Sequence, residues 1–225
     1  MQFIKRLLKR LFQGKYQGLN QLDKKMEAYL DYDGGYYVEL GANDGVTQSN
    51  TLYFEKYRGW KGLLVEPAPH NYLQCRRNRS AKNKIHCAAC VSFDYDREFV
   101  RIAYSNLMST PLGVSTDIAD PTAHARSGRQ FLGPTEDVFE YGAVARTLND
   151  LLGESGAPAK MDFLSLDVEG VELEVLRGID HTAYRFKFIL VECRDFDRMN
   201  AYLRDAKYAF VDKLSAHDYL FRSDV

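Results

Sequence analysis

The sequence has few cysteines and no long hydrophobic run. Its apolar stretches are far shorter than the roughly 20 residues that a helix needs to cross a bilayer, and the N-terminus lacks the continuous apolar core of a secretory signal. The four cysteines show no paired CxxC or Cys/His spacing of the kind that binds zinc. Cys87 and Cys90 lie in the apolar run Ile85–Val91, which predicts inert buried thiols. We therefore expect a cytoplasmic protein that neither spans a membrane nor is exported.

The sequence also has almost no net charge. Lys and Arg number 30 against 31 Asp and Glu, which leaves −1. This balance gives no overall electrostatic reason to expect a nucleic-acid partner. A hydrophobic content of 45% in 225 residues excludes a disordered chain and predicts one large globular domain with short appendages.

The basic residues are concentrated at the N-terminus. Residues 1–15 contain five basic side chains and no acid, and apolar residues follow one another there at helical spacing. This pattern predicts a basic amphipathic helix. It either packs on the domain or on a second subunit of a homodimer, or makes a peripheral contact with anionic lipid at the inner membrane face. We expect an N-terminal helical segment over residues 1–33.

Residues 34–225 show the alternation of short apolar runs and amphipathic stretches that is typical of βαβ units. Runs such as FLSLD and FILVE are apolar on both faces, as the central strands of a parallel sheet are. The expected strands are Tyr36–Leu40, Gly62–Glu66, Lys84–Val91, Phe163–Asp167 and Phe188–Glu192. The expected helices are Ser49–Tyr57, His70–Asn78, Val171–Gly178 and Asp197–Asp205.

Two segments interrupt this alternation. Residues from about 105 to 141 contain three of the six prolines and little periodicity, which predicts a long loop or partly helical insertion on the substrate side. The C-terminal residues predict two short strands, Tyr208–Asp212 and Asp218–Arg222, joined by a brief turn. An antiparallel hairpin at one edge of the sheet is the natural place for them.

The first expected strand runs directly into a turn flanked by glycines, VELGANDG. Gly41 and Gly45 allow the backbone to bend sharply and to approach a ligand closely. Such a turn binds nucleotide-like ligands in doubly wound sheets, at the carboxyl ends of the strands. Because the turn carries Glu39 and Asp44, it suits a cationic ligand better than a pyrophosphate, and this argues against a dehydrogenase.

Further acids end the other expected strands. Glu66 ends the second strand, at the position from which a carboxylate accepts hydrogen bonds from ribose hydroxyls in this topology. Asp167 and Glu169 follow the strand FLSLD, and Glu192 ends FILVE. These acids should share one crevice, whereas Glu172 and Glu174 on the following helix should be solvated.

The sequence closely resembles the FkbM-type methyltransferases, which are S-adenosylmethionine-dependent O-methyltransferases of the class I fold. The resemblance covers about residues 22–212 and is carried by the GANDG turn, the SNT triplet, the GWKGLLVEP strand, the DVEGVELEVLRG stretch and ILVEC, in this order. It implies a Rossmann-like α/β fold with helices on both faces of a mostly parallel seven-stranded sheet. The implied strand order is 3-2-1-4-5-7-6, with an antiparallel C-terminal hairpin.

The resemblance also implies where the cofactor binds. The first turn would surround the methionine part, Glu66 the ribose and the Cys87–Ala88 region the adenine. The residues expected at S-adenosylmethionine are Glu39, Gly41, Asn43, Asp44, Gly45, Ser49, Glu66, Pro67, Cys87, Ala88 and Asp167.

Methyl transfer is an in-line displacement, so the enzyme must position the acceptor oxygen and accept a proton if that oxygen is a hydroxyl. Asp167 is the first candidate for general base or substrate anchor, followed by Glu169 and Glu192. The acids could instead hold Mg²⁺, with Asp167 and Glu192 as its ligands. Two histidines, His124 in the insertion and His217 in the hairpin turn, could replace Asp167 as the base, whereas the remaining candidates His70 and His86 are expected to be structural.

The resemblance implies O-methylation of a hydroxyl on a sugar, a glycan or a secondary metabolite, with N-methylation as an alternative on the same fold. The partners would then be a small-molecule or glycan acceptor and no nucleic acid. The alternative is a non-catalytic nucleoside-binding scaffold that the basic helix recruits to a membrane or to a glycan-assembly complex. The combined presence of GANDG, Glu66 and DVEG favours the enzyme.

Overall fold

The computed structural model describes residues 14–224. The predicted basic helix therefore lies almost entirely outside the described residues. Among residues 14–224, no helix is both long and apolar enough to cross a membrane.

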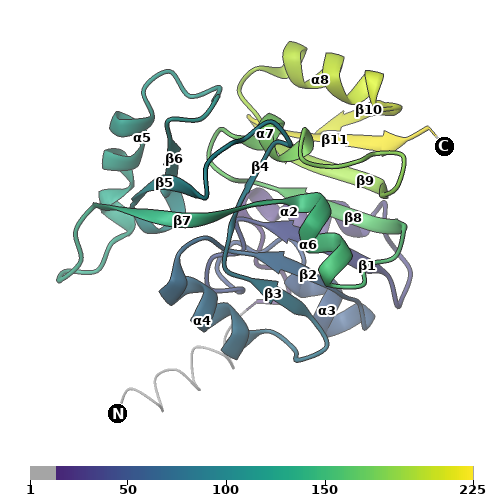
Figure 1. Cartoon of the computed structure of the whole chain (residues 1–225). Coiled ribbons are helices and arrows are strands. Elements are labelled where there is room, and N and C mark those ends of the chain that lie inside the picture. The colour runs from purple at the N-terminus through teal and green to yellow at the C-terminus, as the bar shows by residue number, and fades with distance from the viewer. Residues whose placement is uncertain (1–13, 225) are drawn as a thin grey trace.

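A seven-stranded sheet forms the centre of the molecule (Figure 1). Its strands follow the order β10-β11-β9-β8-β1-β2-β3. Numbered along the chain within this sheet, this is the predicted order 3-2-1-4-5-7-6, and β11 is antiparallel to both of its neighbours. The class I methyltransferase fold is thus confirmed. The strands are β1 (Tyr36–Leu40), β2 (Lys61–Val65), β3 (Lys84–His86), β8 (Lys160–Leu166), β9 (Arg185–Glu192), β10 (Tyr208–Lys213) and β11 (Asp218–Ser223).

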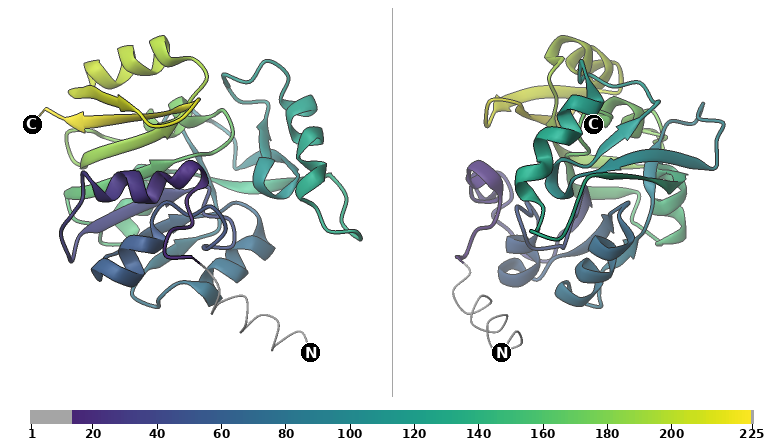
Figure 2. Two further views of the ribbon diagram at one scale, coloured as in Figure 1. Left: turned by 180° about the vertical axis from the view of Figure 1, so that it is seen from behind. Right: turned by 90° about the vertical axis from the view of Figure 1, so that its left-hand side faces the viewer.

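Helices cover both faces of this sheet, because its strands are apolar on both sides (Figure 2). Alternate residues of β1 show the division: Val38 belongs to one buried cluster and Tyr37 to the other. The first cluster includes residues of α6 (Leu148–Glu154), α7 (Glu172–Leu176) and α8 (Phe196–Asp205). The second includes residues of α2 (Leu22–Glu27), α3 (Leu52–Arg58) and α4 (Pro69–Asn78), and the short helix η1 (Leu19–Gln21) precedes α2.

The register of the parallel strands brings four strand ends together. Leu40 of β1 pairs with Val65 of β2 on one side and with Leu166 of β8 on the other, and Leu166 pairs with Val191 of β9. The residues that come next are Gly41, Glu66, Asp167 and Glu192. The acids that the sequence separates by more than a hundred residues therefore line one edge of the sheet.

A second, four-stranded sheet was not predicted. It has the order β4-β7-β5-β6 and comprises β4 (Ala89–Val91), β5 (Phe99–Tyr104), β6 (Thr110–Leu112) and β7 (Phe139–Thr147). The predicted strand Lys84–Val91 is wrong, because β3 ends at His86 and β4 leaves the main sheet to pair with β7. The chain passes from one sheet to the other at Cys87 and Ala88. The sequence gives no sign of this change, because the apolar run is unbroken there.

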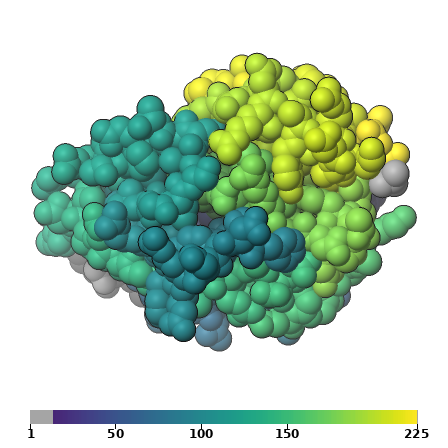
Figure 3. All heavy atoms as spheres, turned by 45° about the horizontal axis from the view of Figure 1, so that its top comes forward, coloured from purple at the N-terminus to yellow at the C-terminus, as the bar shows by residue number. Residues whose placement is uncertain are grey.

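The insertion is more ordered than a long loop. It contains η2 (Asn106–Met108), β6, α5 (Pro121–Ser127), η3 (Gly128–Phe131) and the first residues of β7. In Figure 3 the insertion lies beside the C-terminal half of the chain, and the surface is hollowed where they meet.

Candidate functional site

A cavity of about 310 Å³ lies at the carboxyl ends of β1, β2, β8 and β9. The main sheet contributes its floor, and the insertion with β4 and β5 contributes the opposite wall. Its volume is at the lower end of the range of small-molecule sites, and its position is where ligands bind in open α/β sheets.

The turn after β1 approaches the end of β8 very closely. Gly41 has a φ of +79°, and a Cβ there would lie 1.9 Å from the carbonyl oxygen of Asp167. Only glycine fits this position. The next residues turn into the cavity: the backbone N–H of Asn43 donates to Oε2 of Glu66 (2.8 Å), and its Nδ2 donates to Oδ1 of Asn106 in the insertion (3.0 Å).

Glu66 is buried at the cavity and is held by backbone donors. Its exposed fraction is 5%, and Oε1 accepts a hydrogen bond from the N–H of Ala68 (2.8 Å) while Oε2 accepts from Asn43. Burial raises its pKa to about 7, since the donors offset only part of the desolvation. The remaining lone pairs can accept hydroxyl hydrogens from a bound ligand.

Glu39 supports the turn rather than facing the cavity, which corrects the expectation that it contacts the ligand. Its carboxylate accepts hydrogen bonds from Ser49 Oγ (2.9 Å) and Thr51 Oγ1 (2.7 Å), and it pairs with Arg79 at 3.1 Å. Arg79 also pairs with Glu55 at 2.7 Å, and its side chain is fully buried. The sequence analysis missed Arg79 because it ends the run CRRNR, which looks like a solvated helix end.

Three other predicted cofactor residues lie outside the cavity wall. Asp44 accepts hydrogen bonds from the N–H groups of Val46 (2.9 Å) and Thr47 (2.7 Å), so it stabilises its own turn. Gly45 faces protein, because a Cβ there would meet Arg79 and Cys75. Cys87 contacts the carbonyl oxygen of Pro67. The predicted residues that line the cavity are Gly41, Asn43, Ser49, Glu66, Pro67, Ala88 and Asp167.

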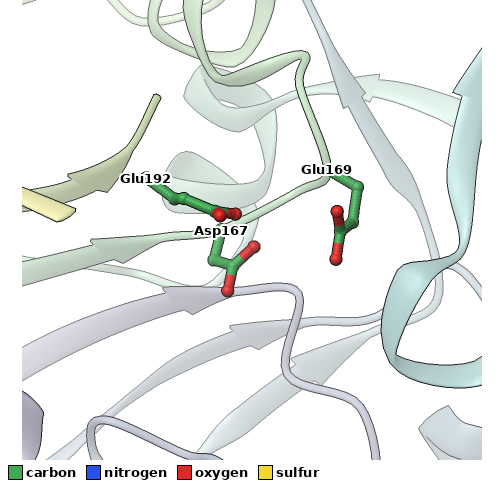
Figure 4. Close-up of side chains that lie close together, drawn as sticks. All are labelled: Asp167, Glu169 and Glu192. Atoms are coloured by element: carbon green, nitrogen blue, oxygen red, sulfur yellow. The ribbon is translucent and has the colours of Figure 1, made fainter. Parts of the chain in front are cut away.

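The three predicted catalytic acids converge at one end of the cavity (Figure 4). Oxygen atoms of Asp167, Glu169 and Glu192 lie within 4.8 Å of one another. Asp167 opens onto the cavity, but the surrounding protein displaces much of the water around it. This burial raises its pKa well above the usual range, and the nearby carboxylates of Glu192 and Glu169 raise it further. Three carboxyl groups this close disfavour simultaneous ionisation.

Two basic side chains adjoin this acid cluster. Nε2 of His124, from α5, lies 2.6 Å from Oε2 of Glu169. Arg194, which follows β9, places its guanidinium 3.6 Å from Glu192 and 3.9 Å from Glu169. The sequence analysis identified His124 but missed Arg194, whose only signal is its position two residues after an acid at a strand end. The cluster therefore already contains a fixed positive charge, and Mg²⁺ stays a prediction.

The other three candidate histidines, His70, His86 and His217, do not line the cavity. His70 contacts the hydroxyl of Tyr104 (2.7 Å), and His86 contacts Oγ of Ser155 (2.8 Å), as expected of structural residues. His217 is exposed in the hairpin turn and is not part of the cavity wall, so it does not adjoin the acids as a base would.

Glu172 is buried, whereas the sequence predicted a solvated side chain. Its exposed fraction is 1%, and Oε1 accepts hydrogen bonds from the N–H groups of Val168 (2.9 Å) and Gly170 (3.1 Å). It therefore holds the loop that carries Glu169. Burial raises its pKa to about 8.

The part of the cavity wall that the second sheet contributes is apolar. Val91, Val100 and Ile102 belong to a separate hydrophobic cluster of the second sheet and also line the cavity, together with Val114 of the insertion. The cavity can therefore hold a ligand that is polar and cationic at one end and apolar at the other.

The chain is similar to known proteins. The family model of the methyltransferase FkbM domain matches residues 39–210. The curated protein Methyltransferase 1 of Beauveria bassiana (strain ARSEF 2860) is 28% identical over 163 residues, which cover 71% of this chain and 64% of that protein. The chain thus spans a little under two thirds of the length of this relative.

Two solved structures are also similar. The human methyltransferase 10 domain containing protein has 12% sequence identity and a TM-score of 0.46, over 91% of this chain and 82% of that one. A SAM dependent methyltransferase from Aquifex aeolicus has 10% identity and a TM-score of 0.44, over 96% of this chain and 95% of that one.

Proposed function

Because the chain belongs to the FkbM methyltransferase family, we propose that it transfers the methyl group of S-adenosylmethionine to a hydroxyl oxygen of a sugar, a glycan or a secondary metabolite. The observation that carries this proposal is the single cavity shared by Glu66, at the end of β2, and by the acids at the ends of β8 and β9.

The residues at the β2 end fit the nucleoside part of the cofactor. Glu66 would accept hydrogen bonds from the two ribose hydroxyls, and the two backbone donors already hold its carboxylate in place. Pro67 and Ala88 offer an apolar surface beside it for the adenine ring. Cofactor recognition would then rest on β1, β2 and the segment after β3.

The acid cluster fits the reacting end. When bound, S-adenosylmethionine supplies an electrophilic methyl carbon on a positively charged sulfur. The oxygen atoms of Asp167, Glu169 and Glu192 present negative or partly negative charge to the cavity, which suits a cationic group beside them. Asp167, which opens onto the cavity, would anchor the acceptor hydroxyl by a hydrogen bond and hold its oxygen in line with the methyl carbon.

The apolar residues of the cavity wall indicate which class of acceptor this cavity would bind. Val91, Val100, Ile102 and Val114 cannot hydrogen-bond to a free sugar, whose surface is covered by hydroxyl groups. An acceptor with an apolar part would bury that part against this wall. Among the three acceptor classes, this favours a secondary metabolite or a glycan that carries an apolar aglycone.

Methyl transfer from radiolabelled S-adenosylmethionine tests the proposal. The acceptor panel pairs methyl glucoside with octyl glucoside and adds hydroxylated aromatic and macrolide compounds. We expect labelled product from acceptors that combine a hydroxyl with an apolar part, and less of it with the Asp167→Asn variant. Binding of the cofactor without transfer to any member would favour the nucleoside-binding scaffold instead.

A further inference from the structure

We infer that His124 of the insertion is the catalytic residue that takes the proton of the acceptor hydroxyl, and that Glu169 is its positioning residue. This inference rests on the proposed function, because it needs an acceptor hydroxyl at the acid end of the cavity. It adds a role for the insertion, which otherwise contributes only a wall.

The two side chains form a close, largely buried pair. His124 Nε2 and Glu169 Oε2 are 2.6 Å apart, and the side chains are 16% and 15% exposed. Both line the cavity, and His124 is the one histidine among the described residues that does so. The pair therefore lies beside Asp167, where the acceptor hydroxyl is expected.

The fold holds the pair in place from two sides. Just before α5, Asp117 donates its N–H to the carbonyl oxygen of Gly170 (3.0 Å), next to Glu169. Its Oδ2 accepts a hydrogen bond from the N–H of Arg194 (2.6 Å), after β9. The insertion is thus docked on the loops after β8 and β9, and this docking fixes the direction from which α5 reaches the cavity.

The start of α5 is equally well defined. Asp120 caps the helix by accepting a hydrogen bond from the N–H of Ala123 (2.9 Å), and Pro121 occupies the first helical position. His124 is the fourth residue of this helix. A base held by a docked and capped helix loses little conformational freedom when the acceptor binds.

Glu169 sets the tautomer of His124. With the carboxylate at Nε2, the ring proton stays on Nε2 and the lone pair is on Nδ1. In the reaction, the hydroxyl oxygen forms a bond to the methyl carbon, the carbon–sulfur bond breaks with its electron pair remaining on sulfur, and the hydroxyl proton moves to Nδ1. The resulting imidazolium is stabilised by Glu169, in the manner of a carboxylate that orients a catalytic histidine.

The charges around the ring favour this assignment. Asp167, Glu169 and Glu192 face it from the ends of β8 and β9, Asp117 and Asp120 lie before and at the start of α5, and Arg194 is the basic neighbour. Of these groups, Glu169 is the one in contact with the ring, at 2.6 Å, and it faces the positive charge that forms there during the reaction. A carboxyl group of this cluster that is already protonated cannot take a further proton, and burial together with its acidic neighbours favours the protonated form of Asp167.

Nitrogen NMR of ¹⁵N-histidine-labelled protein tests the geometry without an acceptor. The His124 signals are assigned by their loss in the His124→Gln variant, and spectra are recorded across pH with and without S-adenosylhomocysteine. We expect the neutral ring of the wild type to carry its proton on Nε2 and a free lone pair on Nδ1, and Glu169→Gln to lose this preference. The opposite tautomer in the wild type would overturn the inference.

Kinetic measurements then distinguish a chemical role of His124 from a role in packing. His124→Gln keeps a donor for Glu169 but has no basic nitrogen, and His217→Gln is the matched control outside the cavity. On the best acceptor of the panel above, we expect His124→Gln to lower kcat by about 100-fold and to abolish the rise of the rate with pH. The KM for cofactor and the binding of S-adenosylhomocysteine should not change.

Full activity of His124→Gln would mean that the histidine only braces α5, and the inference would fall. Failure of the wild-type protein to bind S-adenosylhomocysteine would instead contradict the proposed function itself. The two failures are therefore distinguishable.

Discussion

The carbonyl oxygen of Asp167 occupies the space beside Gly41 where any other residue would carry its Cβ, at 1.9 Å from that position. This contact joins the turn after β1 to the end of β8, and both line the cavity. Neither segment can move far without the other, so these two parts of the cavity wall are built as one unit.

Replacing Gly41 by alanine should therefore unfold the site. We expect Gly41→Ala to lower the free energy of unfolding by about 3 kcal/mol or more, because a strained φ is combined with a backbone collision. Gly34→Ala is the matched control, since Gly34 has a φ of +77° but no atom within 4 Å of the added Cβ. It should cost about 1 kcal/mol. Urea unfolding measures both, and equal losses would show that the contact with Asp167 is unimportant.

Asp167→Asn should reduce turnover far more than cofactor affinity. The amide keeps the size of the side chain but changes how it can hold the acceptor hydroxyl, whereas the nucleoside contacts at Glu66 remain. We expect kcat to fall by at least about tenfold with nearly unchanged binding of S-adenosylhomocysteine. The exposed Asp205→Asn serves as control. Unchanged turnover in Asp167→Asn would remove this residue from the reacting centre.

The pH dependence of folding should report the buried Glu172. Its pKa is raised from 4.5 to about 8 in the folded state, so the fold favours the protonated form. Stability is then full below the unfolded pKa and is lost as the pH rises from about 4.5 to 8. Glu172→Gln can still accept both backbone hydrogen bonds at Oε1 and carries no charge. We expect it to be more stable than wild type at pH 8 by a few kcal/mol and to differ little at pH 5.

This expectation is checked by urea unfolding at several pH values. Glu98→Gln, on the surface, controls for the loss of one charge. If Glu172→Gln were less stable at every pH, the buried carboxylate would be ionised and stabilising, contrary to the structure.

Arg194 should make the activity independent of divalent cations. Its guanidinium lies within 4 Å of both Glu192 and Glu169, where a metal ion would otherwise balance their charge. We expect EDTA to leave turnover unchanged in the wild type. Arg194→Gln should lower turnover. Added Mg²⁺ should restore part of the turnover that this variant loses. Loss of wild-type activity in EDTA, restored by Mg²⁺, would show that the acids bind a metal after all.

The main sheet could be predicted from the sequence because its strands are apolar on both faces and end at acids. The runs YYVEL, GLLVE, FLSLD and FILVE each match an observed strand within a few residues. The second sheet escaped prediction because it buries only one face. Val100 and Ile102 point inward, whereas Phe99 and Phe139 are apolar residues about half exposed on the outer face, so the alternation that marks a half-buried strand is blurred in the sequence.

The site was predicted in part for a related reason. A strand end identifies which residues reach the sheet edge, and this placed Glu66, Asp167 and Glu192 correctly on the cavity. A strand end does not show which acids form ion pairs inside the protein. Glu39 forms an ion pair with Arg79, which lies forty residues later in the sequence, at the end of a helix. No local sequence pattern reveals so distant a partner. His124 reaches Glu169 only through the docking of the insertion, which the sequence does not specify.

The most direct test of the account is a calorimetric titration of the protein with S-adenosylhomocysteine, with NAD as control, across the pH range around the Glu66 pKa of about 7. We expect binding of the sulfur nucleoside but not of NAD, with affinity that rises with pH as Glu66 ionises. Glu66→Gln should bind about tenfold more weakly and lose this dependence, whereas Glu98→Gln should behave as wild type. No binding at saturating ligand, or equal binding by Glu66→Gln, would contradict the assignment of this cavity to the methyl donor.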